Sequence, residues 1–370
     1  MIRSTQLHAY HVEHAKMTEF AGYDMPLWYM ATTGEHMAVR NDSGIFDVSH
    51  MGRFMVGGDK AGPFLEGLVP TNVQSQTAGK AFYTLMLNDN GGIIDDLIIE
   101  KLSDDRYMVV VNAANARIDM DHMSALAPGG LDMTDLTSGS AMIAVQGPKA
   151  AGSLQPITEL DLASLKRFRC IETKVAGEDA LVSRTGYTGE DGFEVIIFNS
   201  SNERPEGALR VWGRLAESST PCGLGARDSL RLEAGFPLHG SDIDQGTDPF
   251  QADLSWVIST GKTGYVGSKA VADAATRHPQ SIRRGLVLEV GIPRHGFEID
   301  GASGAVGSVT SGGFSPIIRK GIALGRVNYD NSDVGTRVSV KVRGDQQVAT
   351  VKKPPFYDEQ LYGWKRQKGN

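Results

Sequence analysis

The chain has 370 residues, of which 41% are hydrophobic and 22% are charged, as is typical of a globular protein. Its length predicts two or three domains and a core large enough to fold without disulfides or structural metals. With 44 acidic against 37 basic residues, the net charge is −7. This acidic balance argues against a nucleic-acid partner, which needs a basic face, but not against a small basic pocket for an anionic ligand.

The first 275 residues mix period-2 and helical hydrophobic patterns without a regular βαβ order. Strands are predicted at 53–56, 82–87, 93–100, 107–111, 142–146, 181–184 and 193–198, and helices at 34–40, 63–68, 114–126, 206–217 and 225–234. Strands that pair locally around interspersed helices favour an α+β architecture over a doubly wound parallel sheet. We therefore expect the α+β class.

The sequence pattern changes after about residue 280. Short strand-like runs follow one another, separated by Gly, Asp, Asn and Ser, and no long amphipathic helix interrupts them. This pattern predicts a small all-β domain, a barrel or a sandwich, with the boundary at 275–281. The polar, aromatic tail at 357–370 is expected to be partly disordered.

The cysteines and the apolar runs bear on the compartment. Cys170 and Cys222 are the only two cysteines and lie far apart in the sequence, so no disulfide framework is expected and a reducing compartment is favoured. The N-terminus is polar and has no signal-peptide h-region, and the apolar runs are too short to cross a bilayer. These features predict a cytoplasmic protein without a membrane partner.

An acidic pair interrupts the apolar strand GGIIDDLIIE, residues 91–100. Because side chains alternate along a strand, Asp95 and Asp96 point to opposite faces, each otherwise lined by Ile or Leu. A carboxylate in an apolar setting is costly unless it has a partner or a task. The pattern leaves two interpretations: a functional carboxylate, or an aspartate that only hydrogen-bonds to backbone at a bulge or strand end.

A second segment, RTGYTGEDGFEV at 184–195, is rich in glycine and acids. The glycines allow close approach of the backbone to a ligand, and Tyr187 offers a ring for stacking. A carboxylate can pair with the N3–H and 2-amino edge of a pterin through two parallel hydrogen bonds. Glu194, between two apolar residues at a strand start, is the better candidate for such a contact. Glu190 and Asp191 are expected to be solvated acids of a hairpin.

A third segment, GLGARDSLRLEAG at 223–235, predicts a helix with Arg227 and Arg231 on one face. Arg227 lies near the helix start, a suitable seat for a ligand carboxylate. Periodicity alone favours the alternative, a surface salt-bridge ladder in which Asp228 and Glu233 pair locally.

Weaker signals accompany these three segments. Tyr83 could stack on a ring, although such a tyrosine more often belongs to a core. His8, His11 and His14 recur at i, i+3 and i+6, which is more typical of an exposed helix face than of a metal site. The segment 308–316 suits a loop over a ligand or a simple turn. Neither a phosphate loop nor a dinucleotide fingerprint occurs.

Longer strings extend these segments along nearly the whole chain. They are AGYDMP (21–26), MAVRNDSGIFDVSHMG (37–52), NGGIIDDLII (90–99), VVNAAN (110–115), QGP (146–148), SRTGYTGEDGFE (183–194), LGARDSLRLEAGFPLHGSDID (224–244), DPFQADLSW (248–256), SVTSGGFSPIIRKGIALG (308–325) and KKPPFY (352–357). In this order they resemble the T-protein (aminomethyltransferase) family of the glycine cleavage system.

The resemblance implies an α+β fold of three domains in a ring around a central channel that holds tetrahydrofolate. Two α+β (ferredoxin-like) units would occupy residues 1–275, the second at roughly 53–140, and a β-barrel would occupy 281–358. The implied reaction transfers the methylene carbon from the aminomethyl-lipoyl arm of the H-protein to tetrahydrofolate. It releases ammonia, forms 5,10-methylenetetrahydrofolate and needs no metal.

The resemblance also implies site residues. Asp96 matches the catalytic aspartate, Glu194 the acid that faces the pterin, and Arg227 the arginine for the folate tail. The other implied folate contacts are Tyr83, Asn112, Tyr187 and Tyr362, the last as the nearest match to a tyrosine of the C-terminal tail.

Departures from the family pattern keep alternatives open. Residues 4–7 replace the usual Thr-Pro-Leu start, and Tyr23 stands where tryptophan is usual. By contrast, segment 262–270 lacks the cysteine of the KGCYxGQE motif of the related folate-binding iron–sulfur assembly proteins, which argues against membership in that family. The alternatives are a tetrahydrofolate-dependent demethylase of a small methyl donor such as dimethylsulfoniopropionate, and a non-catalytic folate-binding scaffold.

Overall fold

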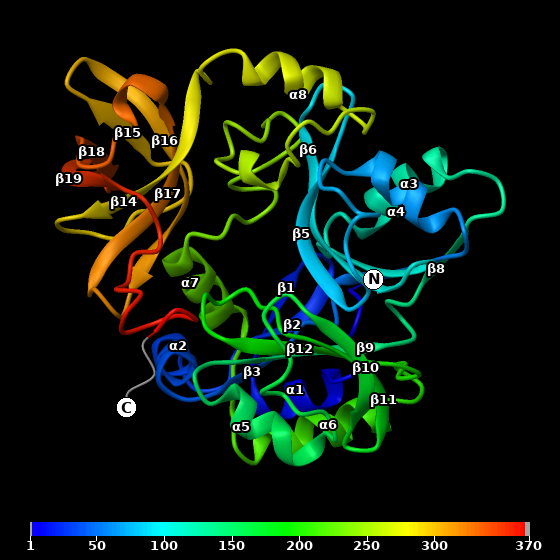
Figure 1. Cartoon of the computed structure of the whole chain (residues 1–370). Coiled ribbons are helices and arrows are strands. Elements are labelled where there is room, and N and C mark those ends of the chain that lie inside the picture. The colour runs from blue at the N-terminus through cyan, green and yellow to red at the C-terminus, as the bar shows by residue number, and fades with distance from the viewer. Residues whose placement is uncertain (1, 367–370) are drawn as a thin grey trace.

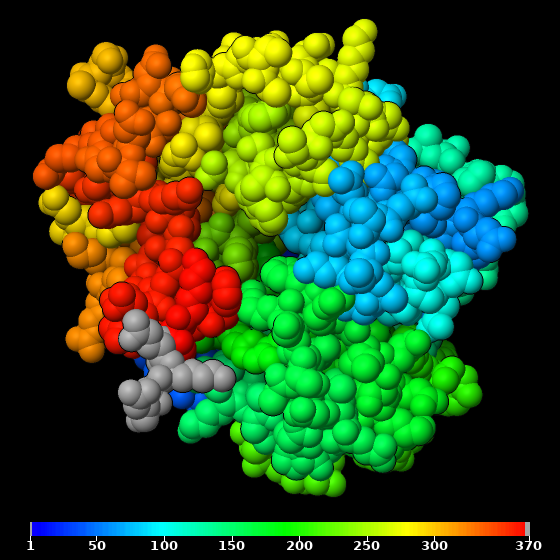
Figure 2. All heavy atoms as spheres, viewed as in Figure 1, coloured from blue at the N-terminus to red at the C-terminus, as the bar shows by residue number. Residues whose placement is uncertain are grey.

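The computed structural model describes residues 2–366. Two α+β lobes and a β-barrel are arranged around a common centre (Figure 1). The space-filling view is hollowed where the three meet (Figure 2). The expected α+β class with a C-terminal barrel is confirmed. Every strand and helix predicted in the first 275 residues is present, with ends that differ by a few residues.

The first lobe is built on a six-stranded sheet in the order β10-β11-β12-β9-β3-β13. Its strands are β3 (Gly44–Asp47), β9 (Ala141–Gln146), β10 (Cys170–Val175), β11 (Glu178–Ser183), β12 (Gly192–Ile197) and β13 (Thr220–Pro221). One face packs on helices α1 (His8–His14), α5 (Ala150–Leu154) and α6 (Glu206–Ala216), because alternate strand residues such as Val182 and Phe193 point into one core with Trp212.

The second lobe is a five-stranded antiparallel sheet in the order β5-β6-β7-β4-β8. Its strands are β4 (Gly52–Gly57), β5 (Lys80–Leu87), β6 (Ile93–Ser103), β7 (Arg106–Val111) and β8 (Asp132–Asp135). Helices α3 (Ala61–Leu68) and α4 (Ala116–Leu126) cover one face, where Leu97 and Ile99 of β6 are buried. On the other face Met108 and Val110 pack against the first sheet, so the two lobes share a core.

Several elements connect the lobes. They are the hairpin β1 (Lys16–Phe20) and β2 (Tyr23–Trp28), α2 (Thr32–Asn41), α7 (Leu224–Ala234), the short 3₁₀ helices η1 (Gln155–Ile157) and η2 (Ser255–Val257), and α8 (Ser268–Ala275). Segment 243–271 packs its apolar residues on Leu85, Leu87 and Ile93 of the second sheet. The hairpin was not predicted, because its strands are only five and six residues long and neither alternates cleanly between apolar and polar residues. The turn at Ala21 and Gly22, both with positive φ, joins them.

The barrel closes from six strands in the order β14-β17-β16-β15-β18-β19. These are β14 (Ser281–Leu288), β15 (Glu298–Gly301), β16 (Gly304–Ser315), β17 (Lys320–Asn328), β18 (Arg337–Val342) and β19 (Asp345–Lys352), with the 3₁₀ helix η3 (Tyr329–Asn331) before β18. Alternate apolar residues fill its interior. A second apolar cluster, Leu232 of α7 with Ile322, Leu324 and Phe356, attaches the barrel to the first lobe.

Residues 357–366 of the C-terminal tail are held against the first lobe by hydrogen bonds. The amide of Trp364 donates to the carbonyl of Gly189 over 3.0 Å, and the amide of Gly363 donates to Glu190 over 2.9 Å. The expectation of partial disorder is therefore wrong for residues 357–366, because buried hydrogen-bond acceptors of the first lobe hold them. Residues 367–370 lie outside the described part of the chain.

Candidate active site

A cavity of about 380 Å³ lies where the three lobes meet. It lies within the size range of small-molecule sites, and most of its lining is apolar. The polar residues that line it include Tyr83, Asp96, Glu100, Asn112, Tyr187, Glu194, Arg227, His239 and Arg283. Six of the seven site residues expected from the sequence are thus brought together; Tyr362 is not among the lining residues.

Asp96 faces this cavity from the middle of β6. The phenol of Tyr83 donates to its Oδ2 over 2.9 Å, and the side-chain amide of Asn112 donates to its Oδ1 over 2.8 Å. Tyr83 in turn stacks on Trp256, with ring centroids 5.6 Å apart. The carboxyl group is therefore held from two sides and keeps little freedom of rotation.

Asp95 points to the opposite, buried face, as strand alternation predicted. Its Oδ2 accepts the amide N–H of Asn112 and its Oδ1 the side-chain amide of Asn115, over 2.9 and 2.7 Å. Asp119 of α4 is also buried, and neither of its carboxyl oxygens has a hydrogen-bond partner within residues 2–366. Burial, followed by the charge of Asp95, raises the pKa of Asp119 to about 10, so this group is a neutral acid at pH 7.

The same surroundings change the pKa of Asp96. Burial and the negative charge of Asp95 raise the pKa of Asp96 to about 6, although the hydrogen bonds from Tyr83 and Asn112 oppose the change. A carboxyl group with a pKa near 6 exchanges protons readily near neutral pH. Asp96 can therefore accept and return a proton while it stabilises nearby positive charge.

Glu194 enters the cavity from β12 of the first lobe. The hydroxyl of Thr185 donates to its Oε2 over 2.5 Å. Burial raises the pKa of Glu194, while Thr185 and the guanidinium of Arg227 act in the opposite direction. The carboxyl group thus lies across the cavity wall from Asp96, on a different lobe, and offers hydrogen-bond acceptors to a ligand.

Arg227 and Tyr187 lie next to each other beside Glu194. The guanidinium carbon of Arg227 is 4.7 Å from the centroid of the Tyr187 ring, which also stacks on Phe236. The hydroxyl of Tyr187 donates to the carbonyl of Pro237. No protein atom among residues 2–366 accepts a hydrogen bond from Arg227, so its guanidinium is available to a ligand.

Tyr362 lies apart from these residues. Its ring packs edge-on to Tyr357, with centroids 6.5 Å apart, and the guanidinium of Arg366 lies 5.8 Å from its centroid. The tail turns at Gly363, whose amide is bonded to Glu190, and this holds Tyr362 away from the cavity lining. The contact with folate expected for Tyr362 therefore stays a prediction, for a residue outside the cavity lining.

Glu100 and His239 are among the cavity residues that were not identified from the sequence. His239 accepts a hydrogen bond from the side-chain amide of Asn115 over 2.8 Å, and Glu100 lines the cavity from β6. A signal for Glu100 existed, because residues i and i+4 of a strand share a face and Asp96 was already placed on it. His239 lies in a loop, where no periodicity could have indicated its direction.

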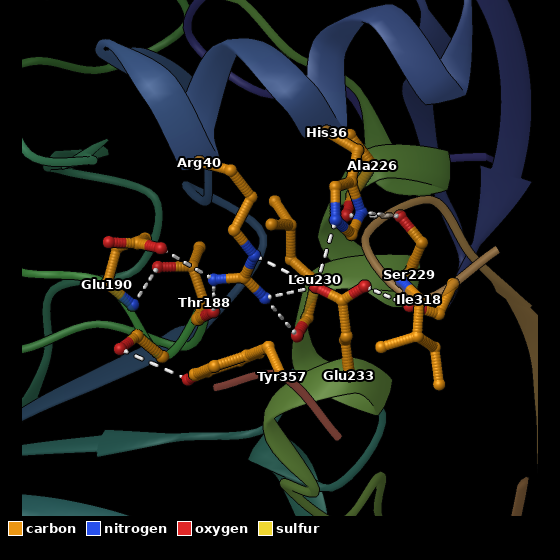
Figure 3. A network of polar contacts seen from close by, with 12 residues as sticks. His36, Arg40, Thr188, Glu190, Ala226, Ser229, Leu230, Glu233, Ile318 and Tyr357 are labelled. Carbon is orange, nitrogen blue, oxygen red and sulfur yellow. Dashed lines mark hydrogen bonds and ion pairs between the residues drawn. The ribbon is translucent and has the colours of Figure 1, made fainter. Parts of the chain in front are cut away.

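Two acids expected at the surface or in local pairs, Glu190 and Glu233, are instead in long-range ion pairs. Figure 3 shows the centre of this network: Arg40 of α2 donates to Glu233 over 2.9 Å and to Glu190 over 3.1 Å, and His36 contacts Glu233 over 3.1 Å. Arg366 of the tail contacts Glu190 over 2.5 Å.

The expectation of a solvated Glu190 and of a surface ladder on α7 is therefore wrong. Glu190 and Glu233 are buried, and so is Arg231, which pairs with Asp242 as well as with its helix neighbour Asp228. Asp191, also expected to be solvated, is half-buried and pairs with Arg184. The reason is packing of segments that are distant in the sequence, which brings opposite charges together in the interior.

The N-terminal histidines also differ from expectation. His11 is buried rather than exposed: its Nε2 is 2.9 Å from Asp47 and its Nδ1 is 2.7 Å from the hydroxyl of Tyr29. His8 pairs with Asp24.

Within residues 2–366, no three His, Cys, Asp or Glu side chains are grouped so as to hold a metal ion. Of the described helices, none combines the length and apolarity needed to cross a bilayer.

A cavity that combines a carboxyl group with a pKa near 6, a second acid and a guanidinium without a protein acceptor in residues 2–366 is typical of an enzyme that acts on a small polar ligand. Comparison with known proteins agrees: residues 7–262 match the model described as the GCVT N-terminal domain, and residues 283–358 match the glycine cleavage T-protein C-terminal barrel domain. The chain belongs to the glycine cleavage T-protein family, as its sequence strings predicted.

Individual relatives are similar over their full length. An aminomethyltransferase of Thermus thermophilus is 41% identical over 358 residues, which cover 96% of this chain and 99% of that protein. One of a Picosynechococcus species is also 41% identical, over 93% of this chain and 94% of that protein. The crystal structure of the glycine cleavage system aminomethyltransferase T of Bartonella henselae is 34% identical, with a TM-score of 0.91, and covers 98% of this chain and 100% of that one.

Proposed function

We propose that this chain transfers the methylene carbon from the aminomethyl-lipoyl arm of the H-protein to tetrahydrofolate, with release of ammonia and formation of 5,10-methylenetetrahydrofolate. The observation that carries the proposal is that Asp96 of β6 and Glu194 of β12 line one cavity although they belong to different lobes. A single ligand can therefore contact both.

The cavity suits a flat heterocycle with an anionic tail. Glu194 supplies two carboxylate oxygens, which match the N3–H and 2-amino group of a pterin. The ring of Tyr187 supplies a stacking surface, and Arg227, without a protein acceptor in the described chain, is left for an anionic group of the ligand. We propose these residues, with Tyr83 and Asn112, as the tetrahydrofolate contacts.

Tetrahydrofolate, when bound, supplies the N5 and N10 atoms that receive the carbon. In the net reaction the C–S and C–N bonds of the donor break and two C–N bonds form, while the two protons lost from N5 and N10 end on the thiol and on ammonia. Asp96 accepts one of these protons and stabilises positive charge beside it. Tyr83 and Asn112 hold its carboxyl group in place.

The partner and compartment follow from the same proposal. Trp256 lines the cavity yet is 68% exposed, and Phe20, also at the lining, is 37% exposed. These two rings offer an apolar entrance suited to the hydrocarbon part of a lipoyl arm.

Cys170 and Cys222 are both buried and unpaired, in agreement with a reducing cytoplasm.

The test is to incubate the protein with tetrahydrofolate and aminomethylated H-protein and to measure ammonia and the folate product. We expect equal amounts of ammonia and 5,10-methylenetetrahydrofolate. Formation of 5-methyltetrahydrofolate from a small methyl donor would instead identify a demethylase, and folate binding without any turnover would identify a scaffold. In a binding titration, Glu194→Ala is expected to weaken the affinity for tetrahydrofolate; unchanged affinity would remove Glu194 from the site.

A further inference from the structure

Glu100 is a second acid of the cavity that the proposed reaction does not use. It follows Asp96 by four residues on β6, so the two side chains share a strand face, with about 13 Å between their Cα atoms at the usual rise per residue. It is only 3% exposed and lines the same cavity as Asp96 and Glu194. An acid this deep is unusual unless it is paired or has a ligand.

The hydrogen bonding of Glu100 is incomplete. The hydroxyl of Ser183 donates to its Oε1, whereas its Oε2 is buried and has no partner within residues 2–366. Ser183 pairs directly with Glu194 across β11 and β12, so the two acids flank one serine at the seam between the lobes. A buried polar atom without a partner is costly, and a ligand in the cavity is what can satisfy it.

Within residues 2–366, no cationic side chain forms an ion pair with Glu100. Its ladder neighbours are Ala81 on β5 and Met108 on β7. The titratable groups that act on it or feel its charge are Glu194 on β12 and Cys170 on β10. Arg227 on α7, which also lines the cavity, offsets the charge of Glu194 but does not lower the pKa of Glu100.

These surroundings divide the two acids into different roles. Burial, with the charge of Glu194 added, raises the pKa of Glu100 to about 8, despite the hydrogen bond from Ser183. Two nearby carboxyl groups in a poorly solvated cavity do not both ionise readily. At pH 7 Glu100 is therefore mostly the neutral acid, which has an O–H to donate, while Glu194 has Thr185 and Arg227 to support its charge.

We propose that Glu100 is a second pterin-binding residue, which donates the hydrogen of its neutral carboxyl group to the carbonyl oxygen at C4 of the ring. On a pterin this carbonyl adjoins the N3–H and 2-amino group that Glu194 would accept. The ring edge thus presents two donors and one acceptor, and the cavity presents an accepting carboxylate and a donating acid. The inference rests on the proposed function, since it takes tetrahydrofolate as the ligand.

The test is an anaerobic binding titration with tetrahydrofolate between pH 6.5 and 9.5, on the wild type, Glu100→Gln, Glu100→Ala and Glu298→Gln. Glu298 is an exposed acid of the barrel and serves as the matched control. Because binding requires the neutral form of Glu100, we expect the wild-type affinity to fall above about pH 8, approaching tenfold per pH unit. Glu298→Gln should behave like the wild type.

The two Glu100 variants should separate the effect of a hydrogen-bond donor at this position from the effect of a negative charge. Gln keeps a donor that does not ionise, so its affinity at pH 7 should stay within about threefold of the wild type and should not fall above pH 8. Ala has no donor and should bind at least tenfold more weakly at pH 7. A wild-type affinity that stays constant from pH 7 to 9.5, or a Gln variant that keeps the fall, would overturn the inference.

The pH dependence of tetrahydrofolate binding by the wild type tests the inference even if a Glu100 variant fails to fold. Failure of this inference is also distinguishable from failure of the proposed function. If the wild type binds tetrahydrofolate and the Glu100 variants match it at every pH, only the role of Glu100 is lost. If the wild type does not bind tetrahydrofolate at any pH, the proposed function itself is lost.

Discussion

Tyr83 donates its phenolic hydrogen to Oδ2 of Asp96 over 2.9 Å. The two residues lie on adjacent strands, where Tyr83 pairs with Ile98 and is therefore a diagonal neighbour of Asp96 on one sheet face. The far side of the Tyr83 ring stacks on Trp256, which is 68% exposed. An aromatic pair thus connects the exposed edge of the cavity to the carboxyl group of Asp96.

This relationship predicts the effect of Tyr83→Phe. The hydrogen bond from Tyr83 lowers the pKa of Asp96, so its loss should raise that pKa above about 6 and move the acid limb of the rate profile to higher pH. We expect roughly a 3- to 10-fold loss of kcat/KM at pH 6 and a smaller loss at pH 8. Tyr265→Phe, at a buried tyrosine outside the cavity lining, is the control and should leave the profile in place.

We expect Asp96 to affect the rate of turnover and not the affinity for tetrahydrofolate. Because its pKa is about 6, the carboxylate is protonated as the pH falls through 6, and the wild-type rate should decline there. Asp96→Asn should lower kcat by roughly 10²-fold or more, from the usual scale of acid–base and electrostatic contributions. Its affinity for tetrahydrofolate should stay close to that of the wild type. A rate near wild type in this variant would exclude the catalytic role.

Arg40 should be essential for stability although it is outside the cavity lining. Arg40→Met leaves Glu233 and Glu190 buried without this cation, so we expect a loss of roughly 3–5 kcal/mol in the free energy of unfolding, measured with urea. The control is Arg117→Met, which removes an exposed i,i+4 pair with Asp121. That change should cost less than about 1 kcal/mol. Equal effects of the two substitutions would contradict the importance given to the buried network.

Substitution of Gly235 tests how closely the C-terminal segment packs against the end of α7. It ends α7 with a φ of 82°, and an added Cβ would lie 2.1 Å from Cβ of Pro354, which lines the cavity. Gly240 has nearly the same φ, 83°, but open space around the added atom. Gly240→Ala should therefore cost about 1 kcal/mol from backbone strain alone. Gly235→Ala should cost clearly more and should also weaken tetrahydrofolate binding, as thermal unfolding and a titration would show.

Much of the molecule could be read from short-range patterns. Strand alternation placed Asp95 and Asp96 on opposite faces of β6, and helical periodicity located α6 and α7. Both depend on backbone geometry over a few residues, which is local and regular. The resemblance of whole strings named Asp96, Glu194 and Arg227, which the fold brings to one cavity.

Other features depend on contacts between distant segments, which no local pattern contains. Glu233 is buried because Arg40, 193 positions away, neutralises it, and periodicity alone favoured a surface ladder. The tail residue Tyr362 stays outside the cavity because Gly363 is bonded to Glu190. The sequence by itself determined many of the elements, the class of fold and the family. Only the tertiary structure decided which charges are buried and that Glu100 joins Glu194 in the cavity wall, because burial and pairing of charges arise where separate lobes meet.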